Sequence, residues 1–322
     1  MSAAPAWLLA VHGGAGEIPE RGEAPAWAAL AREGLEASLR AGGGVLRAGG
    51  GALAAAVEAV AALEDCPAFN AGRGSVANRE GQVEMDAAVM EGTGRRAGAV
   101  AGVGALANPV RAALAVLEGS PHVLLAGAGA EAFARDRGLA AADPAELAAL
   151  ARRLAETWAR RRGGAARERA VGGTVGAVAR DAHGHLAAAT STGGTPGKLP
   201  GRLSDSCLPG AGTWADDATC AVSATGWGEM FIRCAFAHEV DALLRHAGLP
   251  LEEACARALR AVAALGGAGG CIALDRSGAL ALPFDTQGMP RGLLAADGAP
   301  QLAVHPGEEL ALPPGSRGPA QP

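Results

Sequence analysis

The sequence contains no tyrosine and a single lysine, and aromatic residues make up only 3% of its 322 residues. Aliphatic side chains and alanine must therefore form the core, and 49% hydrophobic residues are enough for one large domain or two ordinary ones. A long basic stripe is also missing. The net charge is −5, and the arginines of 160–169 are interrupted by glycines, with no aromatic residues among them. We therefore expect no nucleic-acid binding and interpret 160–169 as a solvated linker.

Disulfide and membrane signals are absent as well. The six cysteines are spread singly and form no CxxC pair, which favours reduced thiols over a disulfide framework or a zinc site. The apolar run AWLLAV near the N-terminus is too short to span a membrane and lacks a preceding basic region, so it predicts a first strand. From these features we expect a cytoplasmic protein with no membrane contact.

Hydrophobic periodicity predicts strands and helices that alternate along the whole chain. Strands are expected at 7–14, 82–92, 96–103, 122–130 and 218–228, and hairpins at 174–192 and 269–286. Helices are expected at 26–64 (two, separated by the glycines of 42–44 and 49–51), from 108, 131 and 143, and across 229–248 and 249–265. This alternation predicts one interwoven α+β domain, with a loose tail at 311–322.

Several familiar chemistries do not fit the sequence. His183 and His185 flank a single residue in a predicted hairpin turn, with no third metal ligand nearby. The stretch GTPGKL resembles a phosphate loop but lacks its full spacing, and no G-x-S-x-G motif occurs. The glycine-rich HGGAG at 12–16 fits an anion-holding loop or an ordinary turn equally well.

Small hydroxyl residues beside glycines are concentrated in the second half, in TSTGG, KLPGRLSDS and SATGWGE. Arg202 and Asp205 lie three residues apart in a loop bounded by proline and glycine. An arginine fork can bind a carboxylate and an aspartate can hold an ammonium group, so the pair suits the backbone end of a free amino acid. A surface ion pair is the alternative. Two glycines also precede Thr174, at the start of a predicted strand.

These segments occur in a specific order: HGGAG, LE-x-CP-x-FNAG-x-G, E-x-DA-x-VM, GTVGAV, TSTGG, KLPGR-x-x-DS, PGAG, TGxGE and ALPF-x-T-x-GM. From His12 to Met289 the chain resembles the plant-type L-asparaginase/isoaspartyl peptidase family of N-terminal nucleophile (Ntn) hydrolases. The resemblance implies a four-layer αββα sandwich in a single domain, 1–322. It also implies self-cleavage between Gly173 and Thr174, into an α subunit of 1–173, ending in a flexible linker at about 158–173, and a β subunit of 174–322.

The resemblance assigns the catalytic roles as follows. Thr174 is the nucleophile, and its freed α-amine, with a reference pKa of roughly 7.7–8.0, is the base. Thr192 orients the nucleophile, and Asn70 lies near it. Thr225 and Gly226 stabilise the oxyanion and contact the substrate. Arg202 and Asp205 hold the substrate's α-carboxylate and α-ammonium groups.

The resemblance also implies a structural sodium ion in the loop 63–73 and no catalytic cofactor. Main-chain carbonyls would hold the ion, from Leu63, Glu64, Cys66, Phe69, Ala71 and Arg73; oxygen ligands suit such a hard cation. The chain departs from the family pattern at Ser204, Cys207, Thr195–Gly197 and Trp227, which flank the expected pocket and bear on substrate preference.

The expected activity is the hydrolysis of L-asparagine and of β-aspartyl (isoaspartyl) dipeptides, releasing L-aspartate. These small molecules are the expected partners, together with a second copy in a homodimer of processed αβ units. Two alternatives remain open: a glycosylasparaginase-like hydrolase, and an unprocessed amino-acid-binding protein.

Overall fold

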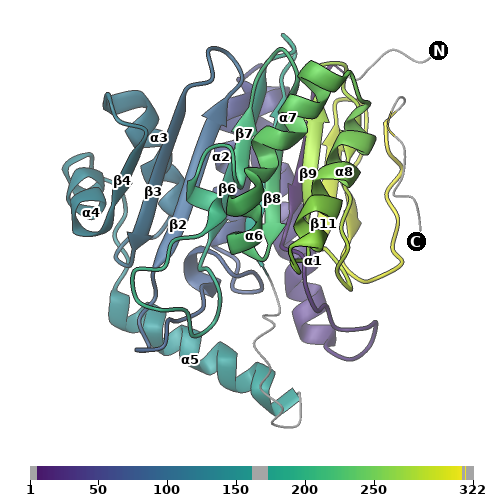
Figure 1. Cartoon of the computed structure of the whole chain (residues 1–322). Coiled ribbons are helices and arrows are strands. Elements are labelled where there is room, and N and C mark those ends of the chain that lie inside the picture. The colour runs from purple at the N-terminus through teal and green to yellow at the C-terminus, as the bar shows by residue number, and fades with distance from the viewer. Residues whose placement is uncertain (1–5, 162–172, 314–315, 317–322) are drawn as a thin grey trace.

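Two β-sheets organise this mixed α+β chain, which a computed structural model describes over residues 6–161, 173–313 and 316 (Figure 1). The larger sheet has the order β12-β11-β1-β5-β6-β2-β3-β4, and only its β3–β4 pair is parallel. Its strands are β1 (Leu8–His12), β2 (Met85–Glu91), β3 (Ala97–Val103), β4 (Leu124–Ala126), β5 (Val175–Arg180), β6 (Leu186–Thr192), β11 (Arg291–Ala295) and β12 (Gln301–Ala303).

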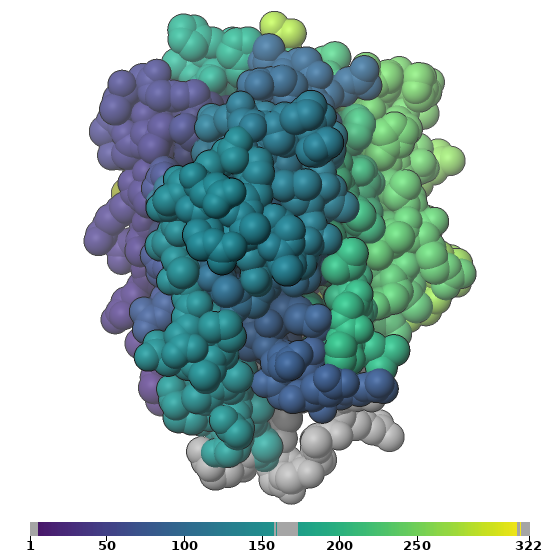
Figure 2. Space-filling view, turned by 90° about the vertical axis from the view of Figure 1, so that its left-hand side faces the viewer, coloured from purple at the N-terminus to yellow at the C-terminus, as the bar shows by residue number. Residues whose placement is uncertain are grey.

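The smaller sheet has the order β10-β9-β8-β7 and comes entirely from the second half of the chain. Its strands are β7 (Thr213–Ala215), β8 (Cys220–Gly226), β9 (Gly269–Asp275) and β10 (Leu280–Ala281). In the larger sheet, β5 lies between β1 and β6, so the strand that begins at Val175 is hydrogen-bonded into the centre of the fold. Segments from both sides of position 174 also pack together in the side view of Figure 2.

Side chains alternate strictly along the central strands, and the two faces of each strand contact different layers. On β1, Leu9 and Val11 belong to a core shared with helices, whereas Leu8 and Ala10 belong to a core shared with the smaller sheet. On β8, Val222 faces helices and Ala221 faces the larger sheet. A distinct apolar core therefore lies between the two sheets.

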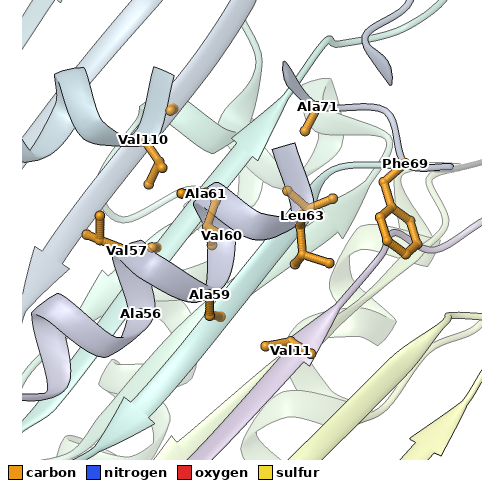
Figure 3. Packing of buried hydrophobic residues seen from close by; sticks show 14 of the residues in the cluster. Val11, Ala56, Val57, Ala59, Val60, Ala61, Leu63, Phe69, Ala71 and Val110 are labelled. Atoms are coloured by element: carbon orange, nitrogen blue, oxygen red, sulfur yellow. The ribbon is translucent and has the colours of Figure 1, made fainter. Parts of the chain in front are cut away.

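Helices α1 (Pro25–Arg47), α2 (Ala52–Glu64) and α3 (Pro109–Gly119) pack on the outer face of the larger sheet. Figure 3 shows α2 side chains such as Val60 and Leu63 packed near Val11 of β1 and Val110 of α3. The glycines of 42–44 do not interrupt α1, contrary to the prediction. A Cβ at Gly42 would lie 2.6 Å from the Ala55 carbonyl oxygen, so this glycine allows α1 and α2 to approach closely.

In the described parts of the chain, the remaining helices are α4 (Gly127–Asp136), α5 (Pro144–Arg161), α6 (Gly228–Cys234), α7 (Phe236–Ala247) and α8 (Leu251–Ala264), and the 3₁₀ turns are η1 (Gly72–Gly74) and η2 (Asp205–Cys207). Helices α7 and α8 cover the outer face of the smaller sheet. The strand expected at 122–130 is confined to β4, because the chain turns at Gly127 (φ 53°) into α4. Ala235, with φ 46°, separates α6 from α7.

Three strands, β7, β11 and β12, were not predicted; two of them have only three residues. Most of the expected linker, 162–172, lies outside the described residues. At the start of the expected loose tail, the Gln301 side chain exchanges two hydrogen bonds with the backbone of Ala311, and Ser316 Oγ accepts one from Leu280 N. Within the described ranges, no helix combines the length and apolarity that a membrane crossing requires.

Candidate active site

A cavity of about 440 Å³ opens beside the start of β5 and collects most of the residues predicted for catalysis and substrate binding, though not Thr225. Its lining includes Asn70, Gly173, Thr174, Thr192, Arg202, Asp205 and Gly226. These residues come from five separated segments, which explains why no single short motif identified the site. The cavity volume lies within the range of small-molecule sites.

Strand alternation explains why the hydroxyl groups converge. Thr174 continues the inner face of β5, on which Val178 lies, and Thr192 continues the inner face of β6, on which Leu186 and Ala188 lie. Thr225 shares the inner face of β8 with Ala221. All three threonine side chains therefore belong to the space between the sheets, at one end of the apolar core.

Thr174 is buried, and its hydroxyl oxygen lies 3.4 Å from the Ser206 hydroxyl, which belongs to η2. Ser206 was not among the predicted site residues, although it lies next to Asp205. No Thr192–Thr174 hydrogen bond occurs among the described residues, so the orienting role of Thr192 stays a prediction. Thr192 instead accepts a hydrogen bond from Gly194 N, at 3.0 Å.

The peptide group before Thr174 is closely surrounded. A Cβ at Gly173 would lie 2.8 Å from Thr225 Oγ1, and a Cβ at Gly14 (φ 103°) would lie 2.2 Å from Gly173 N. Thr225 Oγ1 accepts a hydrogen bond from Ala15 N, at 3.1 Å. The HGGAG loop therefore lies directly against the expected cleavage site, and glycine is the residue that fits at both facing positions.

Asn70 joins its loop to the TSTGG segment. Its side-chain amide donates to Gly194 O at 2.6 Å, its backbone carbonyl accepts from Gly193 N at 2.9 Å, and its Oδ1 accepts from Val76 N at 3.0 Å. With both ends of the amide engaged, the orientation of this side chain is fixed at the cavity wall.

Arg202 and Asp205 present complementary charges to the cavity. Arg202 Nε and Nη2 bind both carboxylate oxygens of the half-exposed Glu229, at 2.9 and 3.0 Å, and the remaining Nη1 faces Gly194. Asp205 is 2% exposed, and its Oδ2 has no hydrogen-bond partner among the described residues. Burial raises the pKa of Asp205 to about 7, against the opposing effect of the Arg202 charge. An unpartnered buried carboxylate of this kind suits a ligand cation.

A buried hydroxyl network that was not predicted lies behind Thr174. His12 Nε2 contacts Ser223 Oγ at 2.9 Å, Ser223 contacts Thr190 Oγ1 at 2.8 Å, and Thr213 donates to Thr190 at 2.7 Å. Burial lowers the pKa of His12 to about 3, with a hydrogen bond to the Thr174 backbone acting in the opposite direction, so the imidazole is neutral. The sequence signal for these residues is a polar side chain at a position of β1, β6 or β8 that faces the space between the two sheets.

The only lysine, Lys198, is also buried, and burial lowers the pKa of its ammonium group. Its Nζ donates to Glu84 O at 2.5 Å, and its own carbonyl accepts from Arg79 N at 3.0 Å. Lys198 therefore attaches the loop that carries Arg202 to the segment before β2.

In the loop 63–73, glycines lie directly against two of the six predicted carbonyl oxygens. A Cβ at Gly72 would lie 2.4 Å from Glu64 O, and one at Gly74 would lie 1.9 Å from Phe69 O. Glycines thus keep the space next to two of the six predicted carbonyls open. Across the described ranges, no three histidine, cysteine, aspartate or glutamate side chains are placed to hold a metal ion.

Comparison with known proteins gives extensive matches. A family model described as asparaginase matches residues 5–304. An isoaspartyl peptidase of Escherichia coli K12 is 46% identical over 307 residues, covering 92% of this chain and 96% of that protein. A plant-type L-asparaginase of Pyrobaculum calidifontis is 41% identical, covering 88% and 95%. An isoaspartyl peptidase/L-asparaginase of Xenopus laevis is 36% identical, covering 95% and 97%.

Proposed function

The chain belongs to the asparaginase family, and we propose that it is a self-processing threonine hydrolase acting on L-asparagine and β-aspartyl dipeptides. One observation carries the proposal: Thr174 shares a cavity with the guanidinium of Arg202 and with the buried carboxylate of Asp205, whose Oδ2 has no hydrogen-bond partner within the part of the chain that the structure describes. A substrate with a free α-amine and α-carboxylate satisfies both charges. Its side-chain carbonyl then lies towards the nucleophile.

Self-cleavage comes first in the proposed sequence of events. The Thr174 hydroxyl attacks the Gly173 carbonyl carbon, and the peptide C–N bond breaks as an ester forms. Water then hydrolyses the ester, which restores the hydroxyl and leaves Thr174 with a free α-amine. The close contacts of Gly173 with Thr225 and of Gly14 with Gly173 hold this peptide group in place. Until cleavage, the amine is locked in an amide and is not a base.

Substrate hydrolysis follows the same two-step chemistry. The α-amine of Thr174 takes the hydroxyl proton, and the oxygen attacks the substrate's side-chain carbonyl carbon. The Thr225 hydroxyl and the Gly226 backbone stabilise the negative oxygen of the tetrahedral intermediate. The amide nitrogen takes a proton as its C–N bond breaks, and it leaves as ammonia or as the free amino group of the second residue. Water hydrolyses the remaining ester and releases L-aspartate.

A sodium ion in the loop 63–73 is proposed as a structural element. The open space next to Glu64 O and Phe69 O supports it, and carbonyl oxygens suit a hard cation. The ion would stabilise the loop that carries Asn70, at the cavity wall, and would take no part in the chemistry.

Finer architectural features are proposed as well. Apolar cores on both sides of each sheet support the four-layer αββα sandwich of Ntn hydrolases. The homodimer of processed αβ units and the cytoplasmic location stay predictions.

The first test is the intact mass of the purified protein after incubation at neutral pH. We expect two fragments that begin at residues 1 and 174 and together equal the precursor plus one water. Thr174→Ala should stay in one piece, whereas Thr93→Ala, at an exposed position that does not line the cavity, should be cut normally. A folded wild-type chain that stays uncut would refute the proposal and favour the unprocessed binding protein.

Activity assays then define the substrate. The cut protein should release L-aspartate from L-asparagine and from β-aspartyl dipeptides. Activity confined to glycosylated asparagine would favour the glycosylasparaginase-like alternative instead.

A further inference from the structure

Trp227 is a large apolar side chain that remains exposed at the cavity. It lines the cavity and is 45% exposed. Its Nε1 forms no hydrogen bond with any described residue, so the N–H is open to solvent or to a ligand. A partly exposed indole at the mouth of a small-molecule site provides a flat apolar surface for a ligand.

The backbone of Trp227 is held firmly from both sides. Its N–H donates to Ala268 O at 3.0 Å, and its carbonyl accepts from Met230 N at 2.9 Å. A Cβ at Gly226 (φ 149°) would lie 2.4 Å from Ala268 O, and one at Gly228 would lie 2.6 Å from Asp205 Oδ1. The backbone from which the indole projects is therefore fixed between Asp205 and the segment around Ala268.

Substrate geometry determines which group reaches this surface. The α-amine and α-carboxylate of the aspartyl unit are held by Asp205 and Arg202, and its side-chain carbonyl lies at Thr174. The leaving group must occupy the remaining cavity, whose lining includes Trp227, Gly266 and Ala268 together with the polar residues Glu17, Asp285, Thr286 and Gln287. A Cβ at Gly266 would meet no atom within 4 Å, so this part of the wall leaves space for a side chain.

We propose that Trp227 forms the subsite for the leaving residue of β-aspartyl dipeptides and favours leaving residues with large apolar, above all aromatic, side chains. This inference rests on the proposed function and specifies its substrate class. L-Asparagine and β-aspartyl-glycine have no leaving-group side chain, so they gain nothing from the indole face. Aromatic side chains gain the most, because stacking adds to the apolar area that is buried.

The test compares kcat/KM for β-aspartyl-phenylalanine, β-aspartyl-leucine and β-aspartyl-glycine in the mature enzyme. Trp227→Ala should lower the phenylalanine-to-glycine ratio roughly tenfold and the leucine-to-glycine ratio less. Trp227→Phe should keep most of the phenylalanine preference. Val123→Ala, at another exposed apolar residue that does not line the cavity, should leave both ratios unchanged.

Two outcomes would overturn the subsite. Equal losses on all three dipeptides would show a structural effect of the substitution, and unchanged ratios would show that the indole does not contact the leaving residue. Failure of the proposed function looks different: the wild-type protein would hydrolyse neither L-asparagine nor any of the dipeptides.

Discussion

The ionisation of Asp205 should make the stability of the empty site depend on pH. In the unfolded chain this carboxyl group titrates near 3.8, and in the folded chain burial raises its pKa to about 7, against the Arg202 charge. Between these values the folded chain holds a proton that the unfolded chain has released. The free energy of unfolding therefore falls as pH rises, by about 1.4 kcal/mol per unit. Over about three units the loss is on the order of 4 kcal/mol, complete above pH 7.

Asp205→Asn removes this titration and keeps the side-chain shape. An unsatisfied amide hydrogen bond in the variant lowers the free energy of unfolding by the same amount at every pH. The pH dependence of the stability difference between the two proteins therefore reports on the carboxyl group alone. As pH rises from 4 to 8, the free energy of unfolding of the variant should increase relative to that of wild type by on the order of 4 kcal/mol. The variant should also bind substrate poorly, because the α-ammonium group loses its partner.

Urea unfolding at several pH values measures this difference. Both proteins should carry Thr174→Ala, which keeps the chain in one piece and the transition simple. Asp297→Asn, at an exposed position, is the matched control and should follow the wild-type curve. The reasoning would be refuted if the stability difference between Asp205→Asn and its parent changed by less than about 1 kcal/mol across the pH range.

Two glycine substitutions test the close contacts around Thr174. Gly173→Ala places a methyl group 2.8 Å from Thr225 Oγ1, and it should slow self-cleavage about tenfold or more, followed as fragment formation on denaturing gels; cleavage at the normal rate would contradict this. Gly176→Ala places one 1.9 Å from Ser223 Oγ and 2.5 Å from His12 Nε2, and it should lower the free energy of unfolding by about 1–3 kcal/mol in urea titrations. An unchanged urea midpoint would contradict this and show that the hydroxyl network moves aside for the methyl group at little cost.

The sequence predicted the long elements well and the short ones poorly. Strands such as β6 and helices such as α5 have enough residues for a clear periodicity, whereas β7 and β12 have three residues each and offer none. The glycines of 42–44 were misread as a break because a sequence pattern cannot show that α2 packs against that face of α1.

The site was predictable only through the ordered motifs. Arg202 and Asp205 are three residues apart, and that spacing alone fits a surface ion pair as well as a substrate clamp. Burial distinguishes the two side chains: Asp205 Oδ2 is buried without a partner in the described ranges, whereas Arg202 is bound by the half-exposed Glu229. Burial depends on the packing of η2 against β2 and β8, which no local pattern encodes.

The polar residues missed by sequence reasoning follow one rule. His12, Thr190 and Ser223 occupy inward-facing positions of three strands, where a packed core calls for apolar side chains. Each finds a hydrogen-bond partner in another strand, so the cost of burial is offset only when the whole set is in register. The same register places Thr174, directly before the first residue of β5, beside Ser206. A one-residue register slip of β5 would turn Thr174 to the opposite face of the sheet and misplace the nucleophile, which couples correct folding of the sheet to self-cleavage.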